Sequence, residues 1–288
     1  MPGCEVIVFA LNEERSIERV LRSVLDEPWN AGIELERIIV CTAASTDRTD
    51  DLVTRLMEQD ARIELQRHPT RRGKVHDVND AVAVSRSERL LLMDADVEIS
   101  RGCLTRLLAE LDDGAVGMAV PHRGALNQDA GWLGFTAHLM AGVHNALELP
   151  KAGQVLAIRR SLAAVDTTLG VDDSYQEYRC LAARQVIRRI DEAIVYSMGP
   201  RTLSDFLLQR RRNVALHLAL RRRHGYSVAT LRTGPVVRAV LRTQRLHRPH
   251  LLVLAATLEL VARVLGTWDA YVKRESYVVW RAAQTTRA

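Results

Sequence analysis

The chain has 288 residues, 47% of them apolar and 26% charged, a balance that predicts a folded globular protein and excludes an intrinsically disordered one. Its four cysteines lie far apart and lack Cys-x-x-Cys spacing, which indicates neither a zinc site nor a disulfide framework. The formal net charge of +5 is uneven, because residues 201–250 contain twelve arginines and one acid, so this segment carries +11 and the remainder −6.

The basic segment predicts an anionic partner near the carboxyl-terminal third: a diphosphate, a lipid phosphate, a membrane surface or a nucleic acid. The alternative is an arginine-biased composition on solvated helices. The amino terminus passes almost directly into an apolar run, with no basic region and no cleavable apolar segment. We therefore expect a cytoplasmic protein and no secretion.

The first 120 residues alternate short apolar runs with amphipathic stretches, the pattern of repeated β-α units on a mostly parallel sheet. Asn12 and Asp47 are expected to cap the first two helices. The expected strands are 5–10, 37–41, 62–66, 89–93 and 115–120, and the expected helices are 13–25, 50–57 and 75–84.

Residues 121–153 lose this periodicity and are expected to line a site or to lie beneath one. A strand at 154–159, a helix at 175–184 and two short strands at 188–190 and 193–196 are expected to follow. Beyond residue 200 the sequence predicts three helical pieces, separated at Gly225 and at Gly234-Pro235, with Pro249 opening the last. This pattern indicates one α/β domain over residues 1–200 and an arginine-rich helical extension over residues 201–288.

The last helical piece, residues 251–266, is mostly Leu, Val and Ala, interrupted by Glu259 and Arg263. A membrane-spanning helix needs about 20 apolar residues, so this segment is expected to be too short and too charged to cross a bilayer. Two alternatives are a helix packed on the domain and an amphipathic helix that lies on a membrane surface.

Two carboxylates, Asp94 and Asp96, directly follow the apolar run Arg89-Leu90-Leu91-Leu92-Met93. This places them at the carboxyl end of a central strand, where open α/β sheets bind ligands. Oxygen ligands on a short turn suit Mg²⁺ or Mn²⁺ that bridges a diphosphate. A pair of solvated turn carboxylates is the simpler interpretation of Asp94 and Asp96 taken alone.

Other polar groups are predicted at the same edge of the sheet. Gly73 would let the backbone approach a phosphate, and Lys74 at a helix start would supply a mobile positive charge. Asn12-Glu13-Glu14 follows the first strand and Ser45-Thr46-Asp47 follows the second. Together they offer hydrogen-bond partners for a ribose and a base, although each could be simple helix capping.

These motifs resemble those of the family 2 glycosyltransferases, inverting enzymes with a GT-A fold that binds nucleotide sugars. The resemblance covers roughly residues 5–215, and it implies a Rossmann-like, mostly parallel sheet sandwiched by helices. In family order the matching segments are residues 8–14 (Val-Phe-Ala-Leu-Asn-Glu-Glu), 45–49 (Ser-Thr-Asp-Arg-Thr), 72–74 (Arg-Gly-Lys) with Asn79, 94–96, 172–173 and 209–212 (Gln-Arg-Arg-Arg).

The resemblance implies donor-binding roles at the matching positions. Asp96 would bind Mn²⁺ or Mg²⁺, which neutralises the departing nucleoside diphosphate. Asp94 would approach the ribose or the diphosphate, and Glu13 and Asp47 would border the nucleoside.

It also implies a catalytic base. Asp173 matches the second acid of the family's Glu-Asp motif and would deprotonate the acceptor hydroxyl, since an inverting transfer needs one base on the face opposite the leaving group. Asp172 takes the place of the glutamate and would orient Asp173 or be the base itself. Gln209 and Arg212 match a Gln-x-x-Arg motif near the donor diphosphate and the acceptor.

Two departures limit the resemblance. Asn213 stands where the family usually has tryptophan after the arginine, which argues against processive polymer synthesis. Thr42-Ala43-Ala44 replaces the common Asp-Asp-Gly, one of whose aspartates contacts uracil, so UDP is a first guess only.

Three other functions compete with this interpretation. A sugar-phosphate nucleotidyltransferase would need a glycine-rich loop after the first strand, where this chain has Leu11-Asn12-Glu13-Glu14. A degenerate sugar-nucleotide-binding or membrane-surface module would fit the altered Thr42-Ala43-Ala44. Nucleic-acid binding is disfavoured because the arginines are not interleaved with aromatic residues.

We therefore expect a cytoplasmic, metal-dependent hexosyltransferase-type enzyme. Its predicted partners are a nucleotide-sugar donor, an unidentified hydroxyl acceptor that is a glycan, a lipid-linked molecule or a small molecule, and the inner face of the membrane as a peripheral contact. No nucleic-acid partner is expected.

Overall fold

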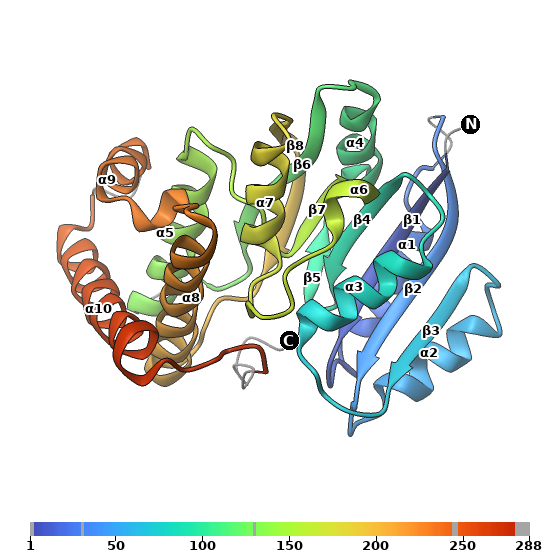
Figure 1. Ribbon diagram of the computed structural model, residues 1–288, viewed down its shortest axis with the longest axis horizontal. Coiled ribbons are helices and arrows are strands. Elements are labelled where there is room, and N and C mark those ends of the chain that lie inside the picture. Colours follow the sequence, from blue (N-terminus) through green and yellow to red (C-terminus); the bar gives the residue numbers. More distant parts are fainter. Residues whose placement is uncertain (1–2, 30–31, 129–130, 244–246, 280–288) are drawn as a thin grey trace.

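The computed structural model describes residues 3–29, 32–128, 131–243 and 247–279, and within them one sheet of eight strands forms the larger part of the molecule (Figure 1). The strands are β1 (Gly3–Ala10), β2 (Glu34–Ala43), β3 (Ile63–His68), β4 (Arg89–Asp94), β5 (Val97–Ile99), β6 (Val116–Ala125), β7 (Val155–Arg159) and β8 (Val186–Ser197). The helices are α1 (Ile17–Leu25), α2 (Thr49–Met57), α3 (Lys74–Val84), α4 (Cys103–Ala109), α5 (Gly131–Ala146), α6 (Arg160–Ala163), α7 (Asp173–Ala182), α8 (Leu203–His224), α9 (Thr233–Arg242) and α10 (Pro249–Trp268).

The strand order is β3-β2-β1-β4-β7-β6-β8-β5. The first four strands are parallel, β7 is antiparallel to β4 and to β6, β8 is parallel to β6, and β5 is antiparallel to β8. Only Ala95 and Asp96 separate β4 from β5, although the two strands lie apart in the order, so the sheet curls. The predicted mostly parallel α/β architecture is confirmed.

The central strands are buried on both faces, as expected for parallel strands covered by helices. In β1, Val6 and Val8 pack into one apolar cluster that includes residues of α1, α2 and α4. Ile7 and Phe9 point to the opposite face, into a second cluster with residues of α3, α6 and α7. Helices therefore cover both faces, and the carboxyl ends of the strands are the place left for a ligand.

The remaining helices form a second region beside the sheet (Figure 1). Phe135 and Leu139 of α5 pack against Ala239 of α9 and Ala255 of α10. Ion pairs hold α8 to α10: Arg210 bonds both carboxylate oxygens of Glu259, at 2.8 and 2.9 Å.

Several predicted elements are corrected by the structure. Residues 131–146 form α5 although no helix is expected there, because Phe135, Leu139 and Val143 are buried four residues apart and outweigh the low helix propensity of the glycines. β5 is also absent from the predicted elements. The two short strands expected at 188–190 and 193–196 are one strand, β8, whose pairing with β6 shifts between Ile190 and Ile194.

Other corrections concern helix ends. α1 begins at Ile17 with Ser16 as its N-cap, so Asn12 is not a cap. Arg48 occupies the N-cap position of α2, but the Asp47 side chain accepts a hydrogen bond from the first N–H of this helix, that of Thr49, at 3.0 Å. Gly225 ends α8 in the left-handed conformation, as expected. Gly234-Pro235 does not separate two helices, because it lies in the first turn of α9, where proline is tolerated.

The last helix is longer than the sequence predicts. It starts at Pro249, as expected, and with the π-helical turn Asp269–Lys273 it makes the one helix of the described residues that is long and apolar enough to cross a membrane by length and composition. The expectation that it is too short is therefore wrong. Its two interior charges do not face outward, since Glu259 contacts Arg210 and Arg263 donates to the carbonyls of residues 230 and 231.

Candidate active site

A cavity of about 430 Å³ lies at the carboxyl ends of β1, β2 and β4, between the sheet and helices α5 and α8. Most residues predicted for the site line this cavity: Glu13, Gly73, Lys74, Asp94, Asp96, Asp172, Asp173, Gln209 and Arg212. They come from segments separated by up to two hundred residues. The cavity is therefore the candidate active site.

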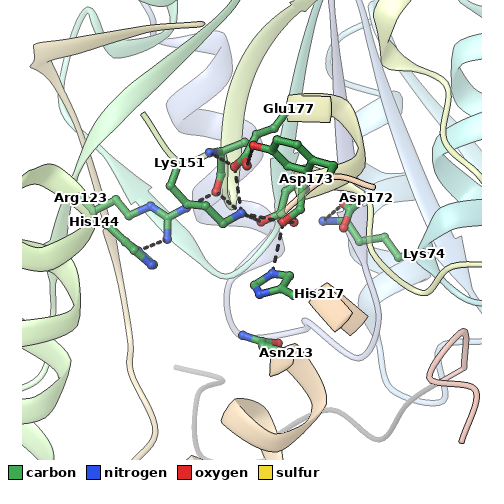
Figure 2. A network of polar contacts seen from close by, with 12 residues as sticks. Lys74, Arg123, His144, Lys151, Asp172, Asp173, Glu177, Asn213 and His217 are labelled. Carbon is green, nitrogen blue, oxygen red and sulfur yellow. Dashed lines mark hydrogen bonds and ion pairs between the residues drawn. The ribbon is translucent and has the colours of Figure 1, made fainter. Parts of the chain in front are cut away.

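Lys74 joins two of the acidic segments. Its Nζ lies 2.6 Å from Asp94 Oδ1 and 2.8 Å from Asp172 Oδ2 (Figure 2 shows the second contact), and it stands over the ring of Phe9. Burial alone would lower the pKa of Lys74, but Asp172 and Asp94 raise it well above its usual value. Lys74 is thus a charged group at the start of α3, where Gly73 has a φ of +100° that only glycine adopts readily.

Asp96 lies in an environment with excess negative charge. Burial, then Asp94 and Glu13, raises the pKa of Asp96 to about 7. The side-chain amide of Gln154 donates to Asp96 Oδ1 at 3.3 Å. A divalent cation would relieve this crowding of carboxylates, so the residues fit the predicted metal.

The cation would need further ligands, because no group of three His, Cys, Asp or Glu side chains in the described part of the chain could hold a metal ion. Mg²⁺ and similar ions commonly combine one or two carboxylates with substrate phosphates and water. Asp94 and Asp96 therefore suit a metal that arrives with a diphosphate.

Asp173 is held by a second buried lysine. Lys151 Nζ lies 3.1 Å from Asp173 Oδ2 and 2.9 Å from Glu177 Oε1, and it donates to Ser174 Oγ at 2.8 Å (Figure 2). Burial alone would raise the pKa of Asp173, but the charges of Lys151 and Arg123 lower it well below its usual range. The carboxylate is therefore ionised and fixed in orientation.

Helix α8 contributes Gln209, Arg212 and His217 to the cavity. Burial lowers the pKa of Arg212 to about 10, while Asp172, Asp173 and Asp94 act in the opposite direction, so the guanidinium remains charged at neutral pH. Burial and Lys151 lower the pKa of His217 to about 3, so His217 is neutral. Asn213 and His217 also line the cavity. They are four residues apart on α8 and therefore share one face of the helix, so the sequence could have indicated that they lie together.

Asn12 and Asp47 do not line the cavity. Asn12 Oδ1 accepts a hydrogen bond from the backbone N–H of Thr46 at 2.7 Å, and Asp47 Oδ2 accepts one from that of Glu14 at 3.1 Å. Asn12 has a φ of 55°, a left-handed conformation that asparagine tolerates. Both side chains join the loops after β1 and β2 and thereby place Glu13 at the cavity.

Arg123, His144 and Lys151 also line the cavity, although sequence reasoning did not identify them. Arg123 follows the buried part of β6, His144 belongs to α5, and Lys151 precedes β7. No local motif marks them, because their partners lie about 20 or more residues away in the sequence.

The residues after α10 return to the cavity rim. A side chain at Gly73 would overlap the carbonyl of Val278, and one at Gly170 would overlap that of Tyr277. Tyr277 also donates from its hydroxyl to Asp269 at 2.7 Å. The segment that follows α10 is therefore packed against the loop that carries Lys74.

The family described as glycosyl transferase family 2 matches residues 5–152, slightly more than half of the chain. No protein among those with curated descriptions matches the sequence significantly. The matched region contains Glu13, Lys74, Asp94 and Asp96, and it ends just before β7.

Two solved structures share the fold. The mannosyltransferase PcManGT from Pyrobaculum calidifontis, in complex with GDP-Man and Mn²⁺, is 20% identical, with a TM-score of 0.65 over 94% of this chain and 88% of the other. Glucosyl-3-phosphoglycerate synthase from Mycobacterium tuberculosis, in complex with Mn²⁺, UDP and glucosyl-3-phosphoglycerate, is 17% identical, with a TM-score of 0.53 over 75% and 79%. At such identities the likeness establishes the GT-A fold.

Proposed function

Because the chain belongs to glycosyl transferase family 2, we propose that it is an inverting, metal-dependent enzyme that moves a sugar from a nucleoside diphosphate to an acceptor hydroxyl. One observation carries the proposal. Asp94, Asp96 and Lys74 lie in the same cavity as a second, lysine-held carboxylate, Asp173. The cavity thus combines groups for a metal diphosphate with a fixed proton acceptor.

The donor diphosphate is assigned to the end of the cavity near β4. Asp96 and Asp94 would hold Mn²⁺ or Mg²⁺, which when bound would neutralise charge on the leaving nucleoside diphosphate. Lys74 is positioned to contact the same phosphates at the start of α3, where backbone N–H groups also favour anions. Gln209 and Arg212 of α8 approach from the opposite wall.

UDP is the first nucleotide to test and GDP is the second. The structures similar in fold contain one or the other. In this chain Thr42-Ala43-Ala44 offers no carboxylate to a uracil, and Cys41 and Ala43 line the cavity at that point. Glu13, which also lines the cavity, is the acid placed to border the nucleoside.

Asp173 is proposed as the general base. Its carboxylate is ionised and lines the cavity, where it can accept a proton from the acceptor hydroxyl as the new glycosidic bond forms, although its lowered pKa makes it a weaker base than an ordinary aspartate. Lys151 and Ser174 keep its carboxylate in one orientation. Asp172 is the alternative base; it is paired with Lys74, the lysine assigned to the donor phosphates, whereas Asp173 is paired with Lys151.

Ligand binding and turnover test the proposal separately. Nucleoside diphosphates with Mn²⁺ should raise the melting temperature, because a ligand that binds only the folded state stabilises it by mass action. Sugar-nucleotide hydrolysis should require Mn²⁺ or Mg²⁺. Asp173→Asn should retain the nucleotide-induced shift and lose transfer. Near-normal turnover of Asp173→Asn would move the base to Asp172.

The same measurements address the second candidate, a catalytically degenerate binding module that the altered Thr42-Ala43-Ala44 segment favours. Such a protein would show the nucleotide-induced shift in melting temperature without metal-dependent hydrolysis of any sugar nucleotide.

We also propose that the protein lies in the cytoplasm and contacts the inner face of the membrane through α10. Val253, Leu260, Val264 and Trp268 are each more than half exposed along one side of this helix. Arg248 precedes this apolar side and Lys273 and Arg274 follow it, with Trp268 and Tyr271 near its end. Apolar faces bounded by aromatic and basic residues are typical of helices at membrane interfaces.

A further inference from the structure

A basic site in the cavity is left unused by the proposed donor chemistry. Arg123 Nη1 donates to His144 Nδ1 at 2.7 Å, and Nη2 donates to the carbonyl of Ala152 at 2.6 Å (Figure 2 shows the Arg123–His144 contact). The guanidinium lies directly on Gly153, where any Cβ would overlap Nη2. Packing therefore fixes Arg123 in one position at the cavity wall.

Arg123 has hydrogen-bonding capacity to spare. An arginine side chain carries five N–H donors, of which the two bonds to His144 and Ala152 use two. Across residues 3–279, outside the short undescribed gaps, no carboxylate forms an ion pair with Arg123. Nε takes part in neither bond and is not among the buried polar atoms that lack a partner, so Nε is accessible from the cavity.

His144 adds a further donor at the same place. Burial, with the charges of Arg123 and Lys151, lowers the pKa of His144 well below its usual value, so the ring is neutral. Since Nδ1 accepts the hydrogen bond from Arg123, the proton of the neutral ring is on Nε2. Nε2–H has no acceptor among the described residues.

The other cation nearby is already neutralised. Lys151 is bonded to Asp173 and Glu177, whereas Arg123 is influenced by the same two carboxylates only at longer range. Burial of a charge without a direct partner is unfavourable, and an anionic ligand would remove that cost. Helix α5, which carries His144, also contributes apolar residues to the cavity lining: Leu133, Ala137, Met140 and Ala141.

We propose that Arg123 and His144 bind an oxyanion of the acceptor, a phosphate monoester, and hold it beside Asp173. This inference rests on the proposed function, because it names the acceptor class for the same cavity. The planar guanidinium offers several N–H groups to one phosphate, and the imidazole N–H supplies another. The ester is either a soluble molecule or a lipid phosphate whose apolar part lies along α5.

Binding of two defined phosphates to the full chain tests the proposal. The probes are glycerol 3-phosphate and dihexanoyl phosphatidic acid, measured by calorimetry with UDP and Mg²⁺ at saturation so that the donor phosphate site is filled. Glycerol is the uncharged control. If phosphatidic acid binds more tightly than glycerol 3-phosphate, the acceptor is a lipid phosphate. If the two bind equally, the acceptor is a soluble phosphate ester.

Arg123→Gln should weaken binding of both phosphates about tenfold or more, since a hydrogen bond to a charged group contributes about 1.5–3 kcal/mol. Arg123→Lys keeps the positive charge but lacks the several N–H donors of the guanidinium, so it should lose less affinity. This variant also tests the proposal if Arg123→Gln does not fold. Arg179→Gln is the matched control, because Arg179 also donates two hydrogen bonds, in its case both to backbone carbonyls, but does not line the cavity.

The proposal is overturned if neither phosphate binds the wild-type protein, if the Arg123 variants bind as the wild type does, or if Arg179→Gln lowers affinity as much. Its failure is distinguishable from failure of the proposed function. UDP binding to the wild type and to each variant is measured in the absence of the two phosphate probes. Arg123→Gln should leave the affinity for UDP unchanged. Absence of nucleotide binding in the wild type would instead remove the donor assignment.

Discussion

The sheet and the helical region distribute polar and apolar side chains in opposite ways. In the sheet region, β1 and β4 are buried on both faces, and ion pairs such as Arg19–Glu98 and Arg22–Glu18 lie on the outer surface. In the helical region, Arg210 is paired with Glu259, and Arg211 with Asp269, between α8 and α10, while Leu260 and Val264 are each 62% exposed. Polar contacts join these helices, and apolar side chains face outward.

The comparison supports the proposed membrane contact of the helical region. The sheet has the usual arrangement for a protein in water. An outward apolar face with inward charges is favourable where the outside is itself apolar. The cavity lies at the boundary: the sheet supplies Asp94 and Asp96, and α8 supplies Arg212.

The largest expected effect is on the rate of sugar transfer, after substitution of a cavity residue that the sheet supplies. Asp96→Ala should reduce metal-dependent transfer by at least about 10³-fold, since metal charge stabilisation contributes several kcal/mol and each 1.36 kcal/mol is tenfold in rate. Steady-state rates across a Mn²⁺ series would measure it. The exposed Asp51→Asn is the control, and equal metal response in both variants would contradict the assignment.

The second effect tests whether the internal charges join the two regions. Glu259→Ala leaves Arg210 buried without its bidentate partner and should lower the free energy of unfolding by about 3–5 kcal/mol. Urea denaturation measures the loss. The double variant Arg210→Met/Glu259→Met should be less destabilised than the single one, and a greater loss in the double variant would show that the pair is not the cause.

The third effect tests the outward apolar face. Leu260→Glu should reduce binding to vesicles of anionic phospholipid by roughly 2–3 kcal/mol, because a charge is costly on a membrane-facing surface. Its stability in water should change by less than about 0.5 kcal/mol. Val84→Glu on α3, where Val84 is 49% exposed, is the matched control in a vesicle flotation assay. Equal flotation of wild type and Leu260→Glu would refute the membrane contact.

The smallest effect concerns pH. His217 has a pKa of about 3 in the folded protein against 6.5 unfolded, because it is buried near Lys151 and Arg210. Below pH 6.5 the unfolded chain binds a proton that folded His217 does not, so stability falls with decreasing pH by on the order of 1 kcal/mol per unit. His217→Gln should remove this part of the slope, measured by urea unfolding at pH 6 and pH 4; an unchanged slope would contradict the neutral assignment.

Much of the fold and part of the site could be predicted from the sequence. Apolar runs separated by amphipathic stretches predict β1 to β4, and parallel strands bring their carboxyl ends to one edge. This is why Lys74 and Asp94 could be placed together before their 2.6 Å contact was known. The general location of the cavity follows from the predicted parallel strands.

The other wall of the cavity could not be predicted in the same way. Arg123 and His144 meet because β6 and α5 pack beside each other, and the glycines in α5 conceal its helical period. Lys151 has no motif, since its partners Asp173 and Glu177 are more than 20 residues away. Which side of α10 faces outward could not be predicted either, because it depends on which residues of α10 are covered by α8.

The packing of Val278 against Gly73 has a consequence for how the protein can be divided. Expressing residues 1–200 alone would omit Arg212, and it would also uncover the loop before Lys74 that the distant segment now supports. The predicted boundary near residue 200 divides the cavity lining, because Asp94 lies before it and Arg212 lies after it. A fragment or chimera that keeps the sheet and exchanges the helices should therefore lose nucleotide affinity even if every strand forms correctly.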